Sequence, residues 1–365
     1  MRKSILFVAF SAIALLATTI YGSASDSRGL ITGVIYDAAT GEPIAQATIQ
    51  APDRSITVFS DGQGRYRLRL PHGSLHLKVT HIGYATGEIS LSVSAAGDTV
   101  DFRLRPVAIE LDPVSVFPHD YNVAERIIKE AIERKQEILS RIHDYSGDAY
   151  TKLILTEPGK SADERIYMIT ETQSTFFWEY PDSYKEIIRA RKQTANLVPE
   201  ENLVGVGGIE NFNRNRIEID EYSIVAPTAN DALDYYNYYM LDTLFIDSHA
   251  VFLIDMEPKD EHKPLFSGEI QIVDSTFDVI AVNVRPSKGL VFPLFEDVTY
   301  SQRLAPARGN YWLPAEVRFS GRFVLRAPIP GIPPILDLEY VSSVHSYHVD
   351  EGHSASTFDE YILVV

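Results

Sequence analysis

The stretch that decides the fold begins with Leu30-Ile-Thr-Gly-Val-Ile-Tyr-Asp37 and runs to Pro106. Two turn sequences divide it, Thr40-Gly-Glu-Pro-Ile44 and Ser60-Asp-Gly-Gln-Gly-Arg-Tyr66. Apolar and polar residues alternate through its other runs, which is typical of short antiparallel strands with one buried face. About seven such runs predict a β-sandwich. The apolar positions are Tyr66, Leu68 and Leu70, with Arg65, Arg67 and Arg69 on the opposite face, then Leu75, Leu77 and Val79, Ile89, Leu91 and Val93, and Val100, Phe102 and Leu104.

The same turns carry a resemblance to a known domain. Thr40 to Ile44, Ser60-Asp61 with Gly64 and Tyr66, and Ile82-Gly-Tyr84 follow one another as in the carboxypeptidase-regulatory-like domain. The resemblance implies a prealbumin-like or starch-binding-like sandwich of seven strands over residues 29–106. Such domains often precede bacterial outer-membrane receptors. The resemblance implies no catalysis, because this is the non-catalytic module of carboxypeptidases and has no zinc ligands of its own.

The amino end has the features of a secretory signal peptide over residues 1–24. Arg2 and Lys3 precede an apolar run from Ile5 to Ile20, and Gly22-Ser-Ala24 forms a small-residue cleavage site. A membrane anchor is the alternative, but the apolar run is shorter than the roughly 20 residues that span a bilayer. We therefore expect an exported protein, periplasmic or associated with the outer membrane, without a transmembrane helix after cleavage. The chain has no cysteine, which excludes disulfides and thiolate metal sites.

The charge of the chain excludes one class of partner. The sequence has 33 Lys and Arg residues and 50 Asp and Glu residues, a net charge of −17. Cleavage after Ala24 removes two cations and no anion, so the mature chain carries −19. Such a field repels nucleic acid, so we expect no nucleic-acid partner.

A connector and a helix follow the sandwich. Residues 107–121 contain two prolines and no helical period, which predicts an extended linker. Asn122 and Glu125 then form a variant of the capping box that starts helices. Apolar residues recur at spacings of three and four as far as Ile142, with Lys135 on the same stripe. A helix with one apolar face over residues 123–142 is expected to cover a sheet.

Strand patterns dominate the second domain, residues 122–365. A shorter helix is expected at Ala229 to Tyr236, after Pro227. Strands in series with two helices predict an α+β domain, a curved antiparallel sheet or half-barrel covered by helices. The fold class is therefore mainly β. The expected strands are 148–155, 165–178, 183–190, 250–256, 268–274, 279–285, 312–319 and 322–327.

Three segments of this domain carry a second resemblance. Ser223 to Pro227, Ala232 to Asp242 and Phe266 to Asp274 resemble a Bacteroidetes-type envelope family of unknown function. In that family the regulatory-like sandwich precedes a helix and a half-barrel like that of periplasmic lipoprotein carriers. An outer-membrane barrel then follows. This sequence ends at Val365, where the barrel is expected to begin, so the chain is either a barrel-less relative or a truncated reading frame.

The densest set of candidate metal ligands lies near the carboxyl end: His345, His348, Glu351 and His353. His348 and Glu351 have the H-x-x-E spacing of zinc carboxypeptidases. In an extended segment, however, residues three apart point to opposite faces, and a zinc site needs three converging ligands. We expect a solvated hairpin tip here, and no metal or other cofactor.

Two glycine motifs are incomplete. Gly352-His-Ser-Ala-Ser356 lacks the second glycine of a nucleophile elbow, and too few residues follow it for an acid and a histidine partner to come after the serine. Gly205-Val-Gly-Gly208 lacks the lysine and the glycine spacing of a phosphate-binding loop. The sequence therefore predicts no catalytic residues and no enzyme.

Two further groups allow binding or packing. An aromatic group, if not simply part of the core, forms a stacking platform for sugars or a lining for an acyl chain. The proline-rich stretch Ala327 to Leu336 is a packed loop, or an exposed apolar lip for a membrane or partner. The aromatic group is Tyr235, Tyr236, Tyr238, Tyr239, Phe176, Phe177 and Trp178.

The leading interpretation is a non-enzymatic binding or assembly protein of the cell envelope. Its half-barrel holds an apolar group, a lipid or a segment of a partner such as an outer-membrane protein. The alternatives are a truncated receptor-like outer-membrane protein, a carbohydrate-binding module and, with the weakest support, a zinc hydrolase.

Overall fold

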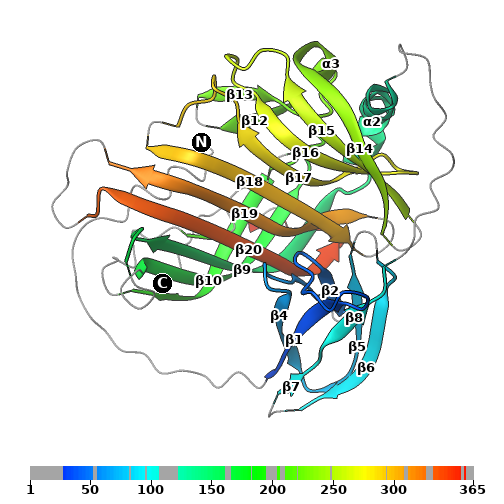
Figure 1. Ribbon diagram of the computed structural model, residues 1–365, viewed down its shortest axis with the longest axis vertical. Coiled ribbons are helices and arrows are strands. Elements are labelled where there is room, and N and C mark those ends of the chain that lie inside the picture. The colour runs from blue at the N-terminus through cyan, green and yellow to red at the C-terminus, as the bar shows by residue number, and fades with distance from the viewer. Residues whose placement is uncertain are drawn as a thin grey trace.

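The computed structural model describes residues 28–358 apart from 52–55, 82–83, 95–96, 107–121, 161–165, 182, 195–203, 206–209, 220, 247–248, 293, 308–310, 326–331 and 355–356. The expected signal peptide, residues 1–24, and linker, residues 107–121, lie outside the described residues. The described chain forms a β-sandwich followed by a large antiparallel sheet with helices on one face (Figure 1). This confirms the predicted fold class.

The sandwich consists of two facing sheets. In one, β4 (Arg65–Pro71) pairs with β1 (Arg28–Asp37), which also pairs in parallel with β7 (Asp98–Thr99) and β8 (Phe102–Leu104). The other has the order β3 (Ile56–Phe59), β2 (Thr48–Ala51), β5 (Gly73–Thr80) and β6 (Gly87–Val93). The alternation seen in the sequence puts one face of each strand into a shared core. That core contains Ile31, Ile35, Ile49, Leu68, Leu70, Leu77, Val79 and Phe102.

Two aspartates explain the turn sequences of the sandwich. Asp37 accepts a hydrogen bond from the backbone N–H of Thr40 at 3.0 Å and from the Tyr84 hydroxyl at 2.8 Å. These bonds hold the pKa of Asp37 below its usual value. Asp61 accepts from the backbone N–H of Arg65 at 2.9 Å, which closes the second turn. Each carboxylate therefore replaces backbone hydrogen bonds that the turn cannot make.

Ten antiparallel strands form the second domain's main sheet. The first of them in the chain, β9, pairs with the last, β20. Strands that are far apart in sequence therefore lie side by side in the middle of the sheet. The two outermost strands, β11 and β14, do not pair with each other, which leaves an open, curved half-barrel (Figure 1). The order is β11 (Ser183–Gln193), β10 (Ile166–Glu179), β9 (Asp144–Thr156), β20 (Ile335–Val349), β19 (Trp312–Val324), β18 (Phe295–Pro306), β17 (Val279–Pro286), β16 (Phe266–Val273), β15 (His249–Pro258) and β14 (Tyr236–Ile246).

The predicted long helix is α2 (Val123–Ser140). Asn122 caps it by accepting a hydrogen bond from the backbone N–H of Glu125 at 3.2 Å. Its apolar stripe packs against the concave face of the sheet beside β14 (Figure 1). After the helix ends, Arg141 donates to Asp278 at 2.9 Å and ties this end to the start of β17. The buried residues of the helix are Ala124, Ile127, Ile128, Ala131 and Lys135.

The structure corrects several details of the sequence prediction. Residues 312–319 and 322–327 were expected as two strands, but one strand, β19, runs through Gly321 because its pairing with β20 continues there. The short helix expected at 229–236 is the single turn α3 (Ala232–Tyr235), because Tyr236 already begins β14. The hairpin of β12 (Arg216–Ile219) and β13 (Tyr222–Val225) was not expected, and neither were the strands β14, β18 and β20.

The sandwich rests on the outer face of the large sheet. Phe59 at the end of β3 packs with Ala305 and Ala315, from β18 and β19. Arg303 of β18 donates to the backbone oxygen of Gln46 at 2.7 Å, and its guanidinium lies 4.5 Å from the centre of the Phe59 ring. The contact therefore combines apolar packing, a hydrogen bond and a cation–π interaction.

Candidate functional site

An apolar pocket lies between the β12–β13 hairpin and the concave face of the sheet. The space between its walls is about 640 Å³, including the open solvent at its mouth. The strands bring together residues that are more than a hundred positions apart in sequence. The side chains that line it include Phe212, Ile217, Ile219, Phe292, Val298 and Phe319.

Polar groups are few in this pocket. Glu210 and Glu218 belong to its lining, and Glu218 is exposed, where it accepts a hydrogen bond from Ser223 at 2.7 Å. Tyr300 also lines the pocket, and its hydroxyl donates to Gln302 at 2.8 Å. Burial raises the pKa of Tyr300, so this phenol is neutral at physiological pH. An uncharged, apolar group fits the apolar part of this lining, where a buried charge would be costly.

A polar cluster beneath α2 fixes the hairpin in place. The buried ammonium of Lys135 donates to Asn215, the residue before β12, and to the backbone oxygen of Thr228 at 2.9 Å. Desolvation lowers the pKa of Lys135, and the nearby Asp231 carboxylate opposes that shift. Arg216 donates to both oxygens of Asp231, at 2.9 and 2.6 Å, which lowers the pKa of that carboxyl. The helix therefore holds one wall of the apolar pocket through directed hydrogen bonds.

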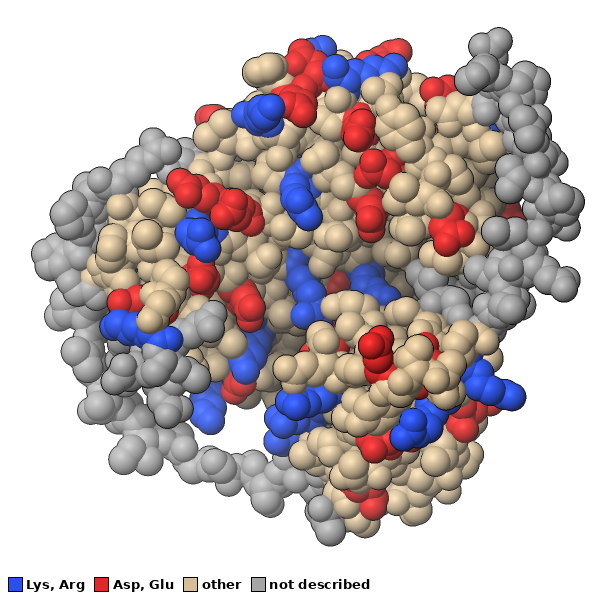
Figure 2. Space-filling model, in the orientation of Figure 1, with Lys and Arg blue, Asp and Glu red and all other residues tan. Residues whose placement is uncertain are grey.

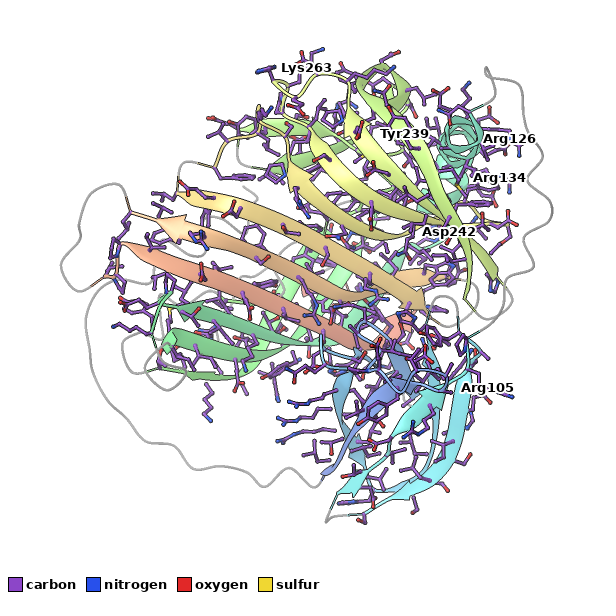
Figure 3. The ribbon with its side chains drawn as sticks, viewed as in Figure 1. Arg105, Arg126, Arg134, Tyr239, Asp242 and Lys263 are labelled. Carbon is purple, nitrogen blue, oxygen red and sulfur yellow. The ribbon has the colours of Figure 1, made fainter. Side chains whose placement is uncertain are left out.

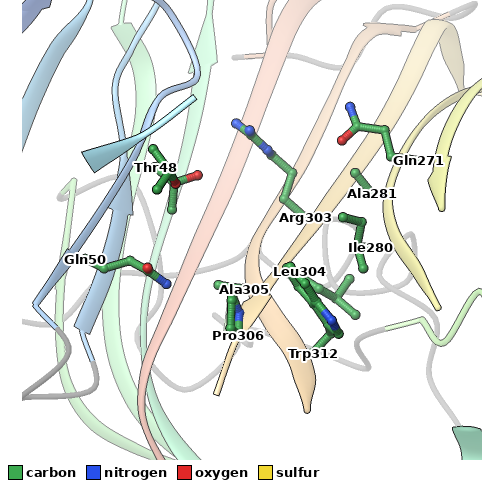
Figure 4. Close-up of a pocket in the computed structure, with 11 residues that line it drawn as sticks. Thr48, Gln50, Gln271, Ile280, Ala281, Arg303, Leu304, Ala305, Pro306 and Trp312 are labelled. Atoms are coloured by element: carbon green, nitrogen blue, oxygen red, sulfur yellow. The ribbon is translucent and has the colours of Figure 1, made fainter. Parts of the chain in front are cut away.

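A second pocket, of about 430 Å³, lies between the two domains (Figure 4). Thr48 and Gln50 of the sandwich lie across it from Arg303 and Trp312 of the large sheet (Figure 4). Removal from water lowers the pKa of Arg303 to about 10, and Glu316 opposes the shift. Because Arg303 is already engaged in the contact between the domains, this pocket is first of all part of their interface.

The aromatic residues singled out in the sequence do not form one platform. Tyr236 and Tyr238 are buried in the core, where their hydroxyls donate to backbone oxygens at 2.6 Å, while Tyr239 is 47% exposed. Phe176 is buried at the other end of the sheet, and Trp178 stacks on Tyr145 there. Phe177, on the opposite face of β10, makes an edge-on ring contact with His353. Tyr235 is contacted elsewhere by the ammonium group of Lys263, which lies over its ring. Most of these residues are packing groups.

The candidate metal ligands do not converge. His345 contacts the hydroxyl of Ser346, while His348 lies 3.2 Å from Glu351. His353 lies against the backbone oxygen of Tyr145 at 3.3 Å. No group of three or more metal-ligating residues occurs in the described part of the chain. The expected hairpin tip was wrong for His345 and His348, because both belong to the long strand β20.

The remaining motifs lie partly outside the described residues. Of the glycine stretch 205–208 only Gly205 is described, and its backbone oxygen accepts a hydrogen bond from the Tyr340 hydroxyl at 2.7 Å. In the stretch 352–356, the Ser354 hydroxyl pairs with that of Thr357 at 3.0 Å. Of the proline-rich stretch 327–336, positions 327–331 are not described, and Ile335 begins β20. Among the described helices, none has the length and apolar character to cross a bilayer.

Comparison with known families decides the assignment. The model of a family described as "Family of unknown function (DUF5686)" matches residues 127–326, more than half of the chain. The chain belongs to this family. A second model, described as "CarboxypepD_reg-like domain", matches residues 31–116, which confirms the predicted sandwich type. This member of the family thus combines a regulatory-like sandwich with a domain of unknown function. A search of curated proteins finds no match.

Solved structures show distant likenesses. A DUF1329 family protein from Desulfovibrio piger is 12% identical with a TM-score of 0.29, covering 65% of this chain and 98% of its own. A LolA superfamily protein from Nitrosomonas europaea is 11% identical with a TM-score of 0.26, covering 64% and 96%. A putative outer membrane lipoprotein-sorting protein domain from Vibrio parahaemolyticus is 13% identical with a TM-score of 0.28, covering 64% and 97%.

Proposed function

We propose that this chain is a non-enzymatic binding protein of the cell envelope that takes the acyl chain of a lipid into its apolar pocket. The observation that carries the proposal is the pocket beneath β12 and β13, with its apolar lining and open mouth. Each methylene that moves from water into such a lining contributes about 0.8 kcal/mol, so a chain of several carbons binds without any charged contact.

The position of the charges supports an amphipathic ligand. Glu210 and Glu218 are the carboxylates of the lining, and other walls are formed by apolar side chains such as Phe266 and Val284. A ligand with an apolar chain and a polar end keeps its polar end in water there. The location in the envelope is supported by the signal-like amino end and by the regulatory-like sandwich.

The proposal is tested with the mature chain, residues 25–365, and a fluorescent fatty-acid probe. Ile219→Trp fills the pocket from β12, and we expect it to weaken probe binding about tenfold, equivalent to about 1.4 kcal/mol. Val298→Phe fills the pocket from the sheet and is expected to act in the same direction. Ile335→Trp is the matched control, since Ile335 is 39% exposed on β20 and does not line the pocket.

Thermal unfolding of each variant establishes that it is folded before binding is compared. A wild-type chain that binds no probe, and that shows no co-purified lipid by native mass spectrometry, would overturn the proposal. Equal binding by the two filling variants and the control would do the same, because the probe would then occupy another part of the surface. Displacement of the probe by an apolar peptide but not by fatty acids would indicate a protein segment instead.

A further inference from the structure

Three arginines form a row on strand β4. Arg65, Arg67 and Arg69 alternate with buried residues of the sandwich core, so strand geometry points all three to the solvent side. We call these three residues the arginine row. Side chains two residues apart on one strand are about 6.8 Å apart along it, so the row spans about 13 Å. Three aligned cations are notable in a chain with a net charge of −17.

The guanidinium groups of the arginine row have no acidic partner among the described residues. Other arginines of this protein are paired: Arg318 lies 2.6 Å from Glu316, and Arg322 lies 3.0 Å from Asp337. No such hydrogen bond or ion pair joins a guanidinium group of the row to any part of the chain that the structure describes. Exposed, unpaired guanidinium groups keep their donors available for an external anion.

More cations lie across the recess that separates the sandwich from β9 and β10. Burial and Glu171 raise the pKa of Tyr150 on β9, and the positive charges of Arg69 and Arg67 oppose this rise. Lys152 lies on the same face of β9 as Tyr150, 3.7 Å from Glu171. Figure 2 shows Lys and Arg side chains on both sides of this recess, and Figure 3 shows the long side chains that β4 directs into it.

The strand that carries the row is an edge strand. Within the described sheet β4 pairs with β1 alone, so its other edge has backbone groups without a strand partner. A strand added at this edge places every second side chain on the same face as the row, directly opposite the arginines. The period of the row is that of a β-strand, which favours a strand-like ligand. A flat bilayer does not fit a recess between two domains.

We propose that β4 is a docking site for an extended acidic peptide of a partner protein, with Asp or Glu at every second position. The added strand is held by main-chain hydrogen bonds to the free edge, and its carboxylates pair with the arginine row. This gives the sandwich a role separate from the apolar pocket. Charge complementarity selects the partner, because the rest of this acidic protein repels such a peptide.

The test uses the mature chain and fluorescein-labelled peptides, followed by fluorescence anisotropy. The first peptide repeats Thr-Glu-Val-Glu, and the second has the same composition with all glutamates adjacent. We expect the alternating peptide to bind at least about tenfold more tightly, and its affinity to fall between about 50 and about 500 mM salt. Equal affinity of the two peptides would overturn the proposal, since a general cationic surface does not distinguish peptides by the spacing of their glutamates.

Variants locate the binding. Arg67→Glu is expected to weaken the alternating peptide at least about tenfold, and the milder pair Arg65→Ser with Arg69→Ser to act in the same direction. Arg105→Glu is the control with the same charge change, because Arg105 is exposed on the other side of the sandwich (Figure 3). Equal losses in Arg67→Glu and Arg105→Glu would overturn the proposal.

Two further measurements separate this site from other ligands. Vesicles of phosphatidylglycerol and soluble dextran sulfate are offered as competitors. If either competitor displaces the labelled peptide at a lower concentration of negative charge than unlabelled alternating peptide does, the peptide assignment is overturned. The ligand would then be a membrane or a polysaccharide. Ile219→Trp, which fills the apolar pocket, is expected to bind the alternating peptide as the wild type does. A failure of lipid binding would therefore leave this result intact.

Discussion

At position 135 a lysine occupies the apolar face of a helix, with 1% of its surface exposed. Its desolvation is offset by hydrogen bonds to Asn215 and to the backbone oxygen of Thr228. A buried ammonium is stable only with such partners, and those partners lose a donor when it is removed. The lysine therefore specifies where the segment that leads into β12 meets α2, which apolar packing alone does not.

We predict that Lys135→Met lowers the free energy of unfolding by about 1–3 kcal/mol, because a buried carbonyl oxygen then lacks its donor. Chemical denaturation followed by circular dichroism measures the change. Lys129→Met on the exposed side of α2 is the control and is expected to change stability by less than about 0.5 kcal/mol. If the two variants proved equally stable, the hydrogen bonds of Lys135 would have no structural role.

Gly64 shows a second single-residue constraint, in the turn before β4. Its φ is +70°, and an added Cβ would lie 2.7 Å from the backbone oxygen of Ile35. Gly64→Ala is predicted to destabilise the sandwich by about 2 kcal/mol or more through backbone strain and this close approach. Gly62→Ala in the same turn is the control, since a Cβ there meets no atom within 4 Å. Calorimetric melting of both variants is the measurement, and equal melting temperatures would contradict the prediction.

At the scale of elements, the sequence predicted what depends on local periodicity. The stripe of α2 and its cap at Asn122 were visible because a long amphipathic helix repeats every 3.6 residues. The strands β9, β10 and β17 were visible through alternation or a short apolar run. By contrast β14 begins directly after the turn of α3, at Tyr236, where the expected helix over residues 229–236 was still to end. Tertiary pairing with β15 overrides that local preference.

The candidate site was predictable only in outline. A concave sheet face covered by a helix was expected to hold an apolar group, and an apolar pocket is present on that face. Its lining residues were not singled out, because Phe212, Ile219, Phe292 and Phe319 have no spacing that relates them in sequence. They meet only because the β12–β13 hairpin folds across strands that come later in the chain. The arginine row was visible as the polar face of β4, but its lack of acidic partners required the structure.

At the scale of the whole molecule, Arg303 couples the two domains. Its guanidinium donates to the backbone oxygen and the side chain of Gln46 and lies over Phe59. Because the two domains share few other directed contacts among those described, we predict that Arg303→Met separates their unfolding into two calorimetric transitions. The expected loss of coupling is about 1–3 kcal/mol.

Arg285→Met is the control for this change, because Arg285 is exposed on the same outer face of the sheet. It removes one positive charge without touching the sandwich and is expected to keep the transition of the wild type. A single unchanged transition in Arg303→Met would show that the apolar contact of Phe59 suffices to couple the domains.

The buried tyrosines are expected to lower the stability of the whole molecule at alkaline pH. Burial raises the pKa of several of them above the usual 10, including Tyr145, Tyr236, Tyr238 and Tyr340. Above pH 10 the unfolded chain releases these phenolic protons while the folded chain keeps them. The folded state then binds more protons, so the free energy of unfolding falls as pH rises. Below pH 10 both states hold these protons, and the contribution is fully present.

Lys135 acts in the opposite direction over part of this range. Its pKa is lowered on folding, so between its folded value and 10.5 the unfolded chain binds the extra proton and stability rises with pH. One lysine is outweighed by several tyrosines, each of which contributes a slope of up to about 1.4 kcal/mol per pH unit. We therefore predict nearly constant stability up to about pH 9–10 and a steep fall above it, measured by urea unfolding at each pH.

Tyr238→Phe identifies the groups responsible for this fall. It removes one buried phenol, so the slope above pH 10 is expected to decrease by up to about 1.4 kcal/mol per pH unit. At neutral pH the variant loses the hydrogen bond to Pro227, at about 1 kcal/mol. Tyr239→Phe is the control, because the exposed Tyr239 side chain meets water in both states (Figure 3). A Tyr238→Phe variant whose stability falls above pH 10 with the same slope as the wild type would contradict the mechanism.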